Sequence, residues 1–171
     1  MEARADRPLT AELLCARYAP RVYRFAAMVA AGDVEAEDLA QDAMVRAIRN
    51  LGQFDVRRGS VEAWLWRIVV NAAIDAGRLS TRRRRLWERF RSEPTTAANV
   101  EDLALLRITA AELLTAVRRL RPRERGMIAL RFGGGLGFAG VGAAYGISPA
   151  AATMAIRRAL DTLRILLKET R

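Results

Sequence analysis

The sequence predicts an all-α fold built from two small helical domains. The chain has 171 residues, 51% of them hydrophobic, which is enough material for a core. Apolar residues recur at intervals of three and four along most of the chain, and no segment alternates convincingly as a strand does. Between residues 80 and 98 the composition changes to a run of arginines followed by Pro94 and small polar residues. We therefore expect domains at residues 1–80 and 100–171, joined by a flexible basic linker at residues 81–99.

Three helices are expected in the first domain. The first covers residues 9 to about 30, and Asp33 is a plausible N-cap for the second. A loop at residues 52–59 follows, and Ser60 can cap a third helix that runs to about residue 79. The second helix has its apolar residues at three-four spacing, which marks one buried face. These residues are Ala40, Ala43, Met44, Ala47, Ile48 and Leu51.

The second domain is expected to end in two helices around a tight turn. An amphipathic helix from about residue 100 to 120 and another from Pro122 to about 132 precede them. Gly146, Ile147, Ser148 and Pro149 supply in order a helix terminator, an apolar plug, an N-cap hydroxyl and a favoured first helical residue. Helices at residues 138–145 and 149 to about 167 would then form a helix-turn-helix, whose second helix enters the major groove of DNA. An ordinary corner between packed helices has the same pattern, so both interpretations remain open at this point.

The positive charge lies in the middle and at the end of the chain. The net charge is +10, but residues 1–78 carry 11 basic and 11 acidic side chains. Residues 79–92 carry six basic and one acidic side chain, and residues 93–171 carry 12 and seven. This asymmetry favours nucleic acid as the partner of the later segments and a protein as the partner of the first.

Several classes of function have no support in the composition. The chain has no histidine and one cysteine, Cys15, so we expect no metal site, no cofactor and no disulfide. The glycines at residues 133–137 lack the lysine and hydroxyl of a phosphate-binding loop, and no nucleophile and base pair is visible. We therefore expect neither an enzyme nor a small-molecule substrate. No signal-like start or apolar run of about 18 to 20 residues occurs, which predicts a cytoplasmic protein without membrane insertion.

Two helix faces are candidates for binding. The helix at residues 34–50 presents charged residues on one face, which is either a solvated, self-paired face or a docking surface. The third helix carries a polar and aromatic stripe, next to a loop that contains Phe54 and two arginines. Such a stripe offers stacking, hydrogen bonds and positive charge to unpaired bases, although a tryptophan taken alone more often fills core. The charged face is Glu35, Asp38, Asp42, Arg46 and Arg49, and the stripe is Trp64, Arg67, Asn71, Asp75 and Arg78.

Four segments in order resemble the extracytoplasmic-function (ECF) sigma factors of the sigma-70 family, the specificity subunits of RNA polymerase. The string DVEAEDLAQDAMVRAIR (33–49) resembles region 2.2, which grips the polymerase, and EAWLWRIVVNAAIDAGR (62–78) resembles regions 2.3 and 2.4, which melt and read the −10 element. The strings LRPRERGMIALRF (120–132) and GISPAAATMAIRRA (146–159) resemble region 4, which binds the −35 element. The resemblance covers nearly the whole chain. It implies a region 2 bundle, a region 4 helix-turn-helix, and three partners: core polymerase, promoter DNA and, by family habit, an anti-sigma factor.

The resemblance, together with the chemistry of the helix faces, gives the candidate site residues. The polymerase contacts would be Asp38, Leu39, Gln41, Asp42 and Arg46. The −10 contacts would be Phe54, Trp64, Arg67, Asn71, Asp75 and Arg78. The linker arginines Arg82, Arg83, Arg84 and Arg85 would follow the DNA backbone, and the −35 contacts would be Ser148, Thr153, Arg157 and Arg158.

Region 4 departs from the family pattern. Seven of the 12 glycines lie between residues 133 and 146, and Gly140 and Gly142 each cost up to about 1 kcal/mol relative to alanine inside a helix. The recognition helix has Thr153 and Ala155 where relatives often carry basic residues. We therefore hypothesise that −35 binding relies on phosphate contacts and DNA shape, or that this domain is ordered only with a partner.

Two other functions remain open. A conventional helix-turn-helix regulator would bind duplex DNA by itself and would not support initiation. A sigma-like chain that occupies the polymerase or an anti-sigma partner without reading promoters would also fit the weak recognition helix.

Overall fold

The computed structural model describes residues 9–88 and 109–169, with side chains placed for 9–82 and 109–169, and it is all-α within these ranges. Short 3₁₀ turns (Leu51–Gln53 and Val56–Arg58) and one π-helical turn, η3 (Ala129–Gly133), join the helices. No strand occurs in the described residues, which confirms the predicted fold class. The helices are α1 (Ala11–Val29), α2 (Asp33–Arg49), α3 (Val61–Glu88), α4 (Ala110–Arg119), α5 (Pro122–Ile128), α6 (Phe138–Tyr145) and α7 (Pro149–Glu169).

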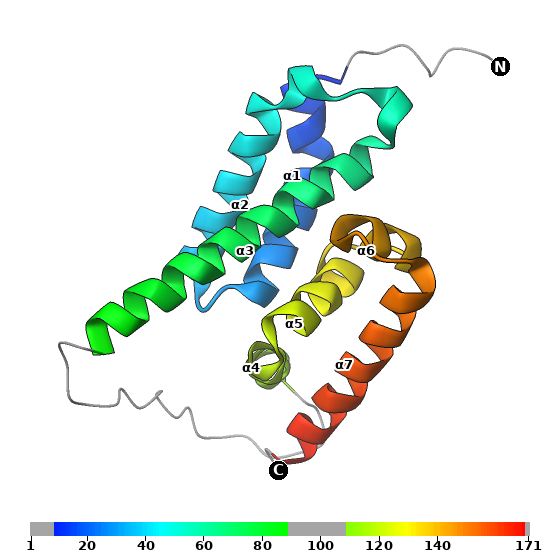
Figure 1. Cartoon of the computed structure of the whole chain (residues 1–171). Helices are drawn as coiled ribbons and strands as arrows, with labels where there is room; N and C mark the ends of the chain where they lie inside the picture. The colour runs from blue at the N-terminus through cyan, green and yellow to red at the C-terminus, as the bar shows by residue number, and fades with distance from the viewer. Residues whose placement is uncertain (1–8, 89–108, 170–171) are drawn as a thin grey trace.

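The first half of the chain is a three-helix bundle. Helices α1, α2 and α3 pack on one another (Figure 1). Thr10 caps α1, and the Ser60 hydroxyl accepts a hydrogen bond from the backbone amide of Ala63 at 3.1 Å, which confirms the predicted start of α3. Gly32 rather than Asp33 is the N-cap of α2. Asp33 instead lies in the first turn, where a carboxylate favours the positive end of the helix dipole.

Helix α3 continues well past its expected end near residue 79, as far as Glu88. Residues 80–88 contain no glycine or proline, and arginine and leucine favour helix, so no signal ends the helix there. The backbone of the arginine run at residues 82–85 is therefore helical. The rest of the expected linker lies outside the described residues.

The second half follows the predicted helices closely. Thr109 and Glu112 form a capping box at the start of α4, while the expected helical residues before 109 lie outside the described part. Helix α5 begins at Pro122 and continues through η3, whose end at Gly133 lies one residue beyond the expected helix end. Helices α6 and α7 have the expected bounds within about two residues.

The turn between α6 and α7 has the geometry of a helix-turn-helix. Gly146 adopts a left-handed conformation (φ +65°), and the Ser148 hydroxyl accepts a hydrogen bond from the Ala151 amide at 3.2 Å. The two helices meet at a bend of 100°, within the range of such motifs. A Cβ at Gly142 would lie 2.7 Å from the carbonyl oxygen of Ile147, so the turn requires glycine there. Gly142 therefore lowers the stability of α6 but allows the chain to turn tightly after it.

The two halves pack against each other and share one continuous core. Helix α1 contacts α5 and η3, and α3 contacts α6 (Figure 1). Buried side chains of both halves, among them Trp66, Leu130 and Leu136, belong to this core. In the described residues no single helix is both long and apolar enough to cross a membrane, and α6 and α7 pass that test only as a bent pair.

Candidate polymerase and nucleic-acid interfaces

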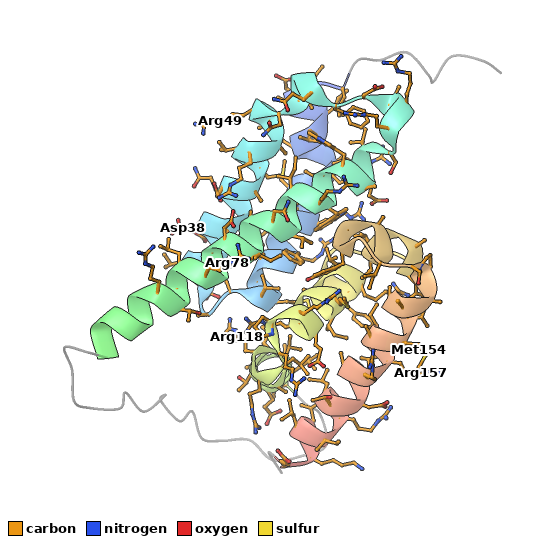
Figure 2. The ribbon with its side chains drawn as sticks, viewed as in Figure 1. Asp38, Arg49, Arg78, Arg118, Met154 and Arg157 are labelled. Carbon is orange, nitrogen blue, oxygen red and sulfur yellow. The ribbon has the colours of Figure 1, made fainter. Side chains whose placement is uncertain are left out.

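The charged face of α2 is exposed. Asp38, Gln41 and Asp42 are exposed, and Arg46 is half-buried. Figure 2 shows Asp38 and Arg49 projecting from the outer side of α2, away from α7. Leu39 differs from the other residues assigned to polymerase binding, because it is only 6% exposed and belongs to the core. Leu39 therefore holds α2 against the core. A partner bound to this face would contact the exposed polar residues beside Leu39 rather than Leu39 itself.

An ion-pair network joins this face to α3. One guanidinium nitrogen of Arg46 lies 2.9 Å from a carboxylate oxygen of Asp42, and the other lies 2.8 Å from Asp75. The hydrogen bond to Asp75, followed by that to Asp42, raises the pKa of Arg46 above its ordinary value. All three side chains are partly exposed, so the network contributes little stability. The network links Arg46, which is assigned to polymerase binding, to Asp75, which is assigned to the −10 element.

The stripe on α3 is also exposed. Arg67, Asn71, Asp75 and Arg78 are exposed, and Figure 2 shows Arg78 on the same helix where it extends toward the basic run. Trp64 is half-buried, and its ring centroid lies 5.4 Å from that of Phe54 in the preceding loop. Trp64 therefore packs against the core and also fixes the loop beside the stripe.

The loop between α2 and α3 holds an exposed arginine in place. The carboxylate of Asp55 accepts hydrogen bonds from the guanidinium of Arg57 and, with a smaller effect, from its backbone amide, and both lower the pKa of Asp55. The Arg57 side chain is 87% exposed. Positive charge is thus presented in the same loop as Phe54, whose ring packs against Trp64.

The recognition helix offers fewer free groups than its sequence suggests. The Ser148 hydroxyl is used in the cap of α7, and the Thr153 hydroxyl donates to the carbonyl oxygen of Pro149 at 2.9 Å. Arg157 and Arg158 are exposed. Of the four residues assigned to the −35 element, the two arginines are thus the ones with a charged group available at the surface.

Met154 is a surface residue that the sequence reasoning missed. Its side chain is 52% exposed, and Figure 2 shows it projecting from the same side of α7 as Arg157. Its position three residues before Arg157 was the available signal, because that spacing places both on one helix face. An unbranched apolar side chain there suits contact with thymine methyl groups.

Two further arginines lie together at the corner of α4 and α5. Arg125 donates a hydrogen bond to the backbone carbonyl of Arg118 at 3.0 Å, and the Nε atoms of both residues are buried without a partner. Burial, with a smaller contribution from the charge of Arg118, lowers the pKa of Arg125. Of the linker arginines, Arg82 is exposed on α3, and the side chains of Arg83, Arg84 and Arg85 lie outside the described residues.

Comparison with known proteins places the chain in a family. Residues 14–85 match the family model of sigma-70 region 2. The chain is 35% identical over 164 residues to the RNA polymerase sigma factor CarQ of Myxococcus xanthus, which covers 92% of this chain and 89% of CarQ. It is 33% identical over 162 residues to the ECF RNA polymerase sigma factor BldN of Streptomyces coelicolor, which covers 90% of this chain. The chain spans 58% of the length of BldN.

Solved structures agree on the fold. The sigma factor RpoE of Bartonella quintana, solved with the anti-sigma factor NepR, matches with a TM-score of 0.69 at 22% identity, over 94% of this chain and 98% of RpoE. CnrH, solved with the cytosolic domain of CnrY, matches with a TM-score of 0.66 at 22% identity, over 94% of this chain and 89% of CnrH. Fold and sequence together define an RNA polymerase sigma factor of the sigma-70 class. Within that class, the chain belongs to the ECF sigma factors.

Proposed function

We propose that this chain directs core RNA polymerase to promoters, binding polymerase through α2, the −10 element through α3 and the −35 element through α7. The observation that supports this most is the continuity of two exposed surfaces. The polar face of α2 and the stripe of α3 meet at the Arg46 network, so a polymerase held on one face would bring DNA to the other. Catalysis is then left to the polymerase.

The α3 stripe has the chemistry needed to hold an unpaired strand. Asn71 and Asp75 offer an amide and a carboxylate to base edges, and Arg67 and Arg78 offer charge to phosphates. Unstacking a base costs a few kcal/mol, which stacking on an aromatic ring and hydrogen bonds can offset. The Phe54 and Trp64 pair at one end of the stripe supplies that aromatic surface.

Binding at the −35 element would depend mainly on phosphate contacts. Arg157 and Arg158 are exposed cations in the middle of α7, and each good base contact is worth only about 1 to 3 kcal/mol. Affinity would then come largely from charge and DNA shape. In this proposal, residues 1–80 bind polymerase and the −10 element, residues 81–99 form the basic linker, and residues 100–171 bind the −35 element.

An anti-sigma partner remains part of the proposal. The sigma factor RpoE was solved with the anti-sigma factor NepR, and CnrH was solved with the cytosolic domain of CnrY. A partner of this kind would regulate the chain by competing for the surfaces that polymerase and DNA need.

The test is run-off transcription with core polymerase on promoter fragments of the source genome. An Asn71→Ala, Asp75→Ala variant is expected to lose at least about tenfold in run-off product, because each lost base contact costs about 1 to 3 kcal/mol. The variant should still co-migrate with core polymerase, because Arg46 keeps its ion pair with Asp42. Ser80→Ala is the matched control, since Ser80 is exposed on the opposite face of α3.

Two results would contradict the proposal at different levels. Full run-off by the double variant would remove the stripe from −10 binding. Failure of the unmodified chain to co-migrate with core polymerase at low salt would overturn the polymerase role altogether. Stable sequence-specific duplex binding by the chain alone, together with that failure, would instead favour a conventional helix-turn-helix regulator.

A further inference from the structure

The first two turns of α7 present apolar groups to solvent. Ala150, Ala151 and Met154 are exposed, and more than half of the Met154 surface (52%) is accessible. Their spacing of three and four residues places them on one face of the helix. The neighbouring Thr153 hydroxyl is engaged within the helix, because it donates to the carbonyl oxygen of Pro149 at 2.9 Å. A partner that docks on this face therefore meets methyl and thioether groups first.

Positive charge follows one turn later on the same face, and negative charge follows after that. Arg157 and Arg158 are exposed, and Arg158 Nε donates to the backbone carbonyl oxygen of Met154 at 3.4 Å. Asp161 is also exposed on this face, and its carboxylate lies 2.9 Å from a guanidinium nitrogen of Arg164. A carboxylate repels the phosphates of DNA. The part of the face suited to DNA therefore ends before Asp161.

The apolar start of α7 matches one group in the major groove. The N-terminal residues of a recognition helix are the ones that contact base edges. In the major groove the C5-methyl group of thymine is the apolar group that a base pair presents, and side chains such as alanine contact it. Met154 is unbranched and flexible, so its thioether can adjust to a methyl group that lies deeper in the groove than an alanine reaches. The chemistry of this face therefore favours thymine.

We propose that Met154, together with Ala150 and Ala151, recognises the C5-methyl groups of thymines in the −35 element, so that apolar contact sets the sequence preference of α7. The proposal rests on the proposed function, in which α7 binds this element. Phosphate contacts by Arg157 and Arg158 supply affinity, while the methyl contacts select the sequence. The preferred ligand is therefore duplex DNA with thymines in the segment that faces the start of α7.

The first measurement removes the methyl groups and leaves the hydrogen-bonding groups of the bases in place. Promoter fragments of the source genome are made with deoxyuridine in place of thymidine in the −35 segment only. Run-off transcription then measures the concentration of the full chain, with core polymerase in excess, that gives half-maximal product. The deoxyuridine promoter should require up to about fourfold more chain for each contacted methyl group, because that group is no longer buried against α7.

Variants of Met154 assign the effect to this side chain. Met154→Ala should fold normally, because the site is exposed and alanine favours helix, and it should lose most of the difference between the two promoters. Met154→Leu keeps an apolar side chain of similar volume and should retain the difference. Ile165→Ala is the matched control, since Ile165 is 59% exposed on the same face. It lies about 16 Å further along α7, beyond the width of the major groove of about 12 Å, so this variant should behave as the unmodified chain.

A second substitution in the DNA adds the methyl group back. At a position where replacing thymine by cytosine lowers run-off, 5-methylcytosine returns a methyl group to the same edge of the major groove without changing the base pair. The unmodified chain should recover up to about fourfold in half-maximal concentration with 5-methylcytosine. Met154→Ala should show little recovery. A chain that distinguishes neither thymine from deoxyuridine nor 5-methylcytosine from cytosine would overturn the proposal.

The outcomes separate this proposal from the proposed function. Full run-off on both thymine and deoxyuridine promoters, or a difference that Met154→Ala retains, would overturn methyl recognition and leave promoter recognition intact. If no run-off occurs, the full chain alone is used at low salt to select duplexes from random pools made with thymidine or deoxyuridine. Enrichment of thymine positions that is absent from the deoxyuridine pool would support methyl recognition while the proposed function fails. Selection without such enrichment would overturn both.

Discussion

Tyr145, the last residue of α6, is held against the α5 helix. Its hydroxyl lies where a Cβ of Gly126 would be, so the tyrosine fits only because residue 126 is glycine. Burial raises the pKa of Tyr145 to about 12, from an ordinary value of 10.0, and the nearby charge of Arg123 acts in the opposite direction. The folded state therefore favours the neutral phenol of Tyr145 over the phenolate.

This burial predicts a loss of stability at alkaline pH. Since the folded pKa is raised, the contribution of Tyr145 is fully present below pH 10 and is lost as the pH rises toward about 12. A shift of this size corresponds to at most about 3 kcal/mol at 1.36 kcal/mol per pKa unit. Urea unfolding at pH 9 and pH 12 should show this loss, and Tyr145→Phe should reduce it. Burial also raises the pKa of Tyr18, so some dependence should remain in the variant. The same loss in both chains would contradict the prediction.

Local sequence rules did well for some residues and failed for others. The caps at Ser60 and Ser148 and the left-handed Gly146 were predicted correctly, because a cap depends on neighbours within three residues. The same rules did not separate Trp64 from Trp66. Trp64 packs beside the loop, whereas Trp66 is fully buried. Only the packing of α1 and of the second half against α3 decides which of the two tryptophans lies in the core.

Among the elements, α6 departs from helix preference at two glycines. It contains Gly140 and Gly142, which by propensity weaken it. The close approach of the Ile147 carbonyl to Gly142 explains one of them. The helix-turn-helix therefore has a less stable α6, because the glycine that permits the tight turn has a low helix propensity.

Opposite effects are therefore expected for two glycine substitutions in helices. Gly142→Ala should destabilise the fold, because the new methyl group would meet backbone at 2.7 Å, despite a propensity gain of about 1 kcal/mol. Gly77→Ala, inside α3 with nothing within 4 Å of its Cβ, should stabilise it by about 0.5 to 1 kcal/mol. Thermal unfolding of the two variants measures both effects. A higher melting temperature for Gly142→Ala would show that the turn does not require glycine.

At the scale of the whole molecule, the charge of +10 is the property most relevant to DNA. Each phosphate contact changes the slope of log affinity against log salt by about 0.9. An Arg157→Gln, Arg158→Gln variant should therefore bind duplex promoter DNA with a slope shallower by about 2. Arg164→Gln is the control, since Arg164 already pairs with Asp161 at 2.9 Å. Equal slopes for the double variant and the unmodified chain, from fluorescence anisotropy titrations, would exclude phosphate contacts by these two arginines.

The sequence by itself determined the all-α class, the order of the motifs and the helix-turn-helix, because these depend on spacing and caps within a few residues. Only the tertiary structure decided that Leu39 is core, that Arg46 bonds to Asp75, and that Gly133 accepts from Arg24. The bonded partners are 29 and 109 positions apart in the chain. No local pattern records such a pairing, since it arises from how the helices pack and from which side chains then fit between them.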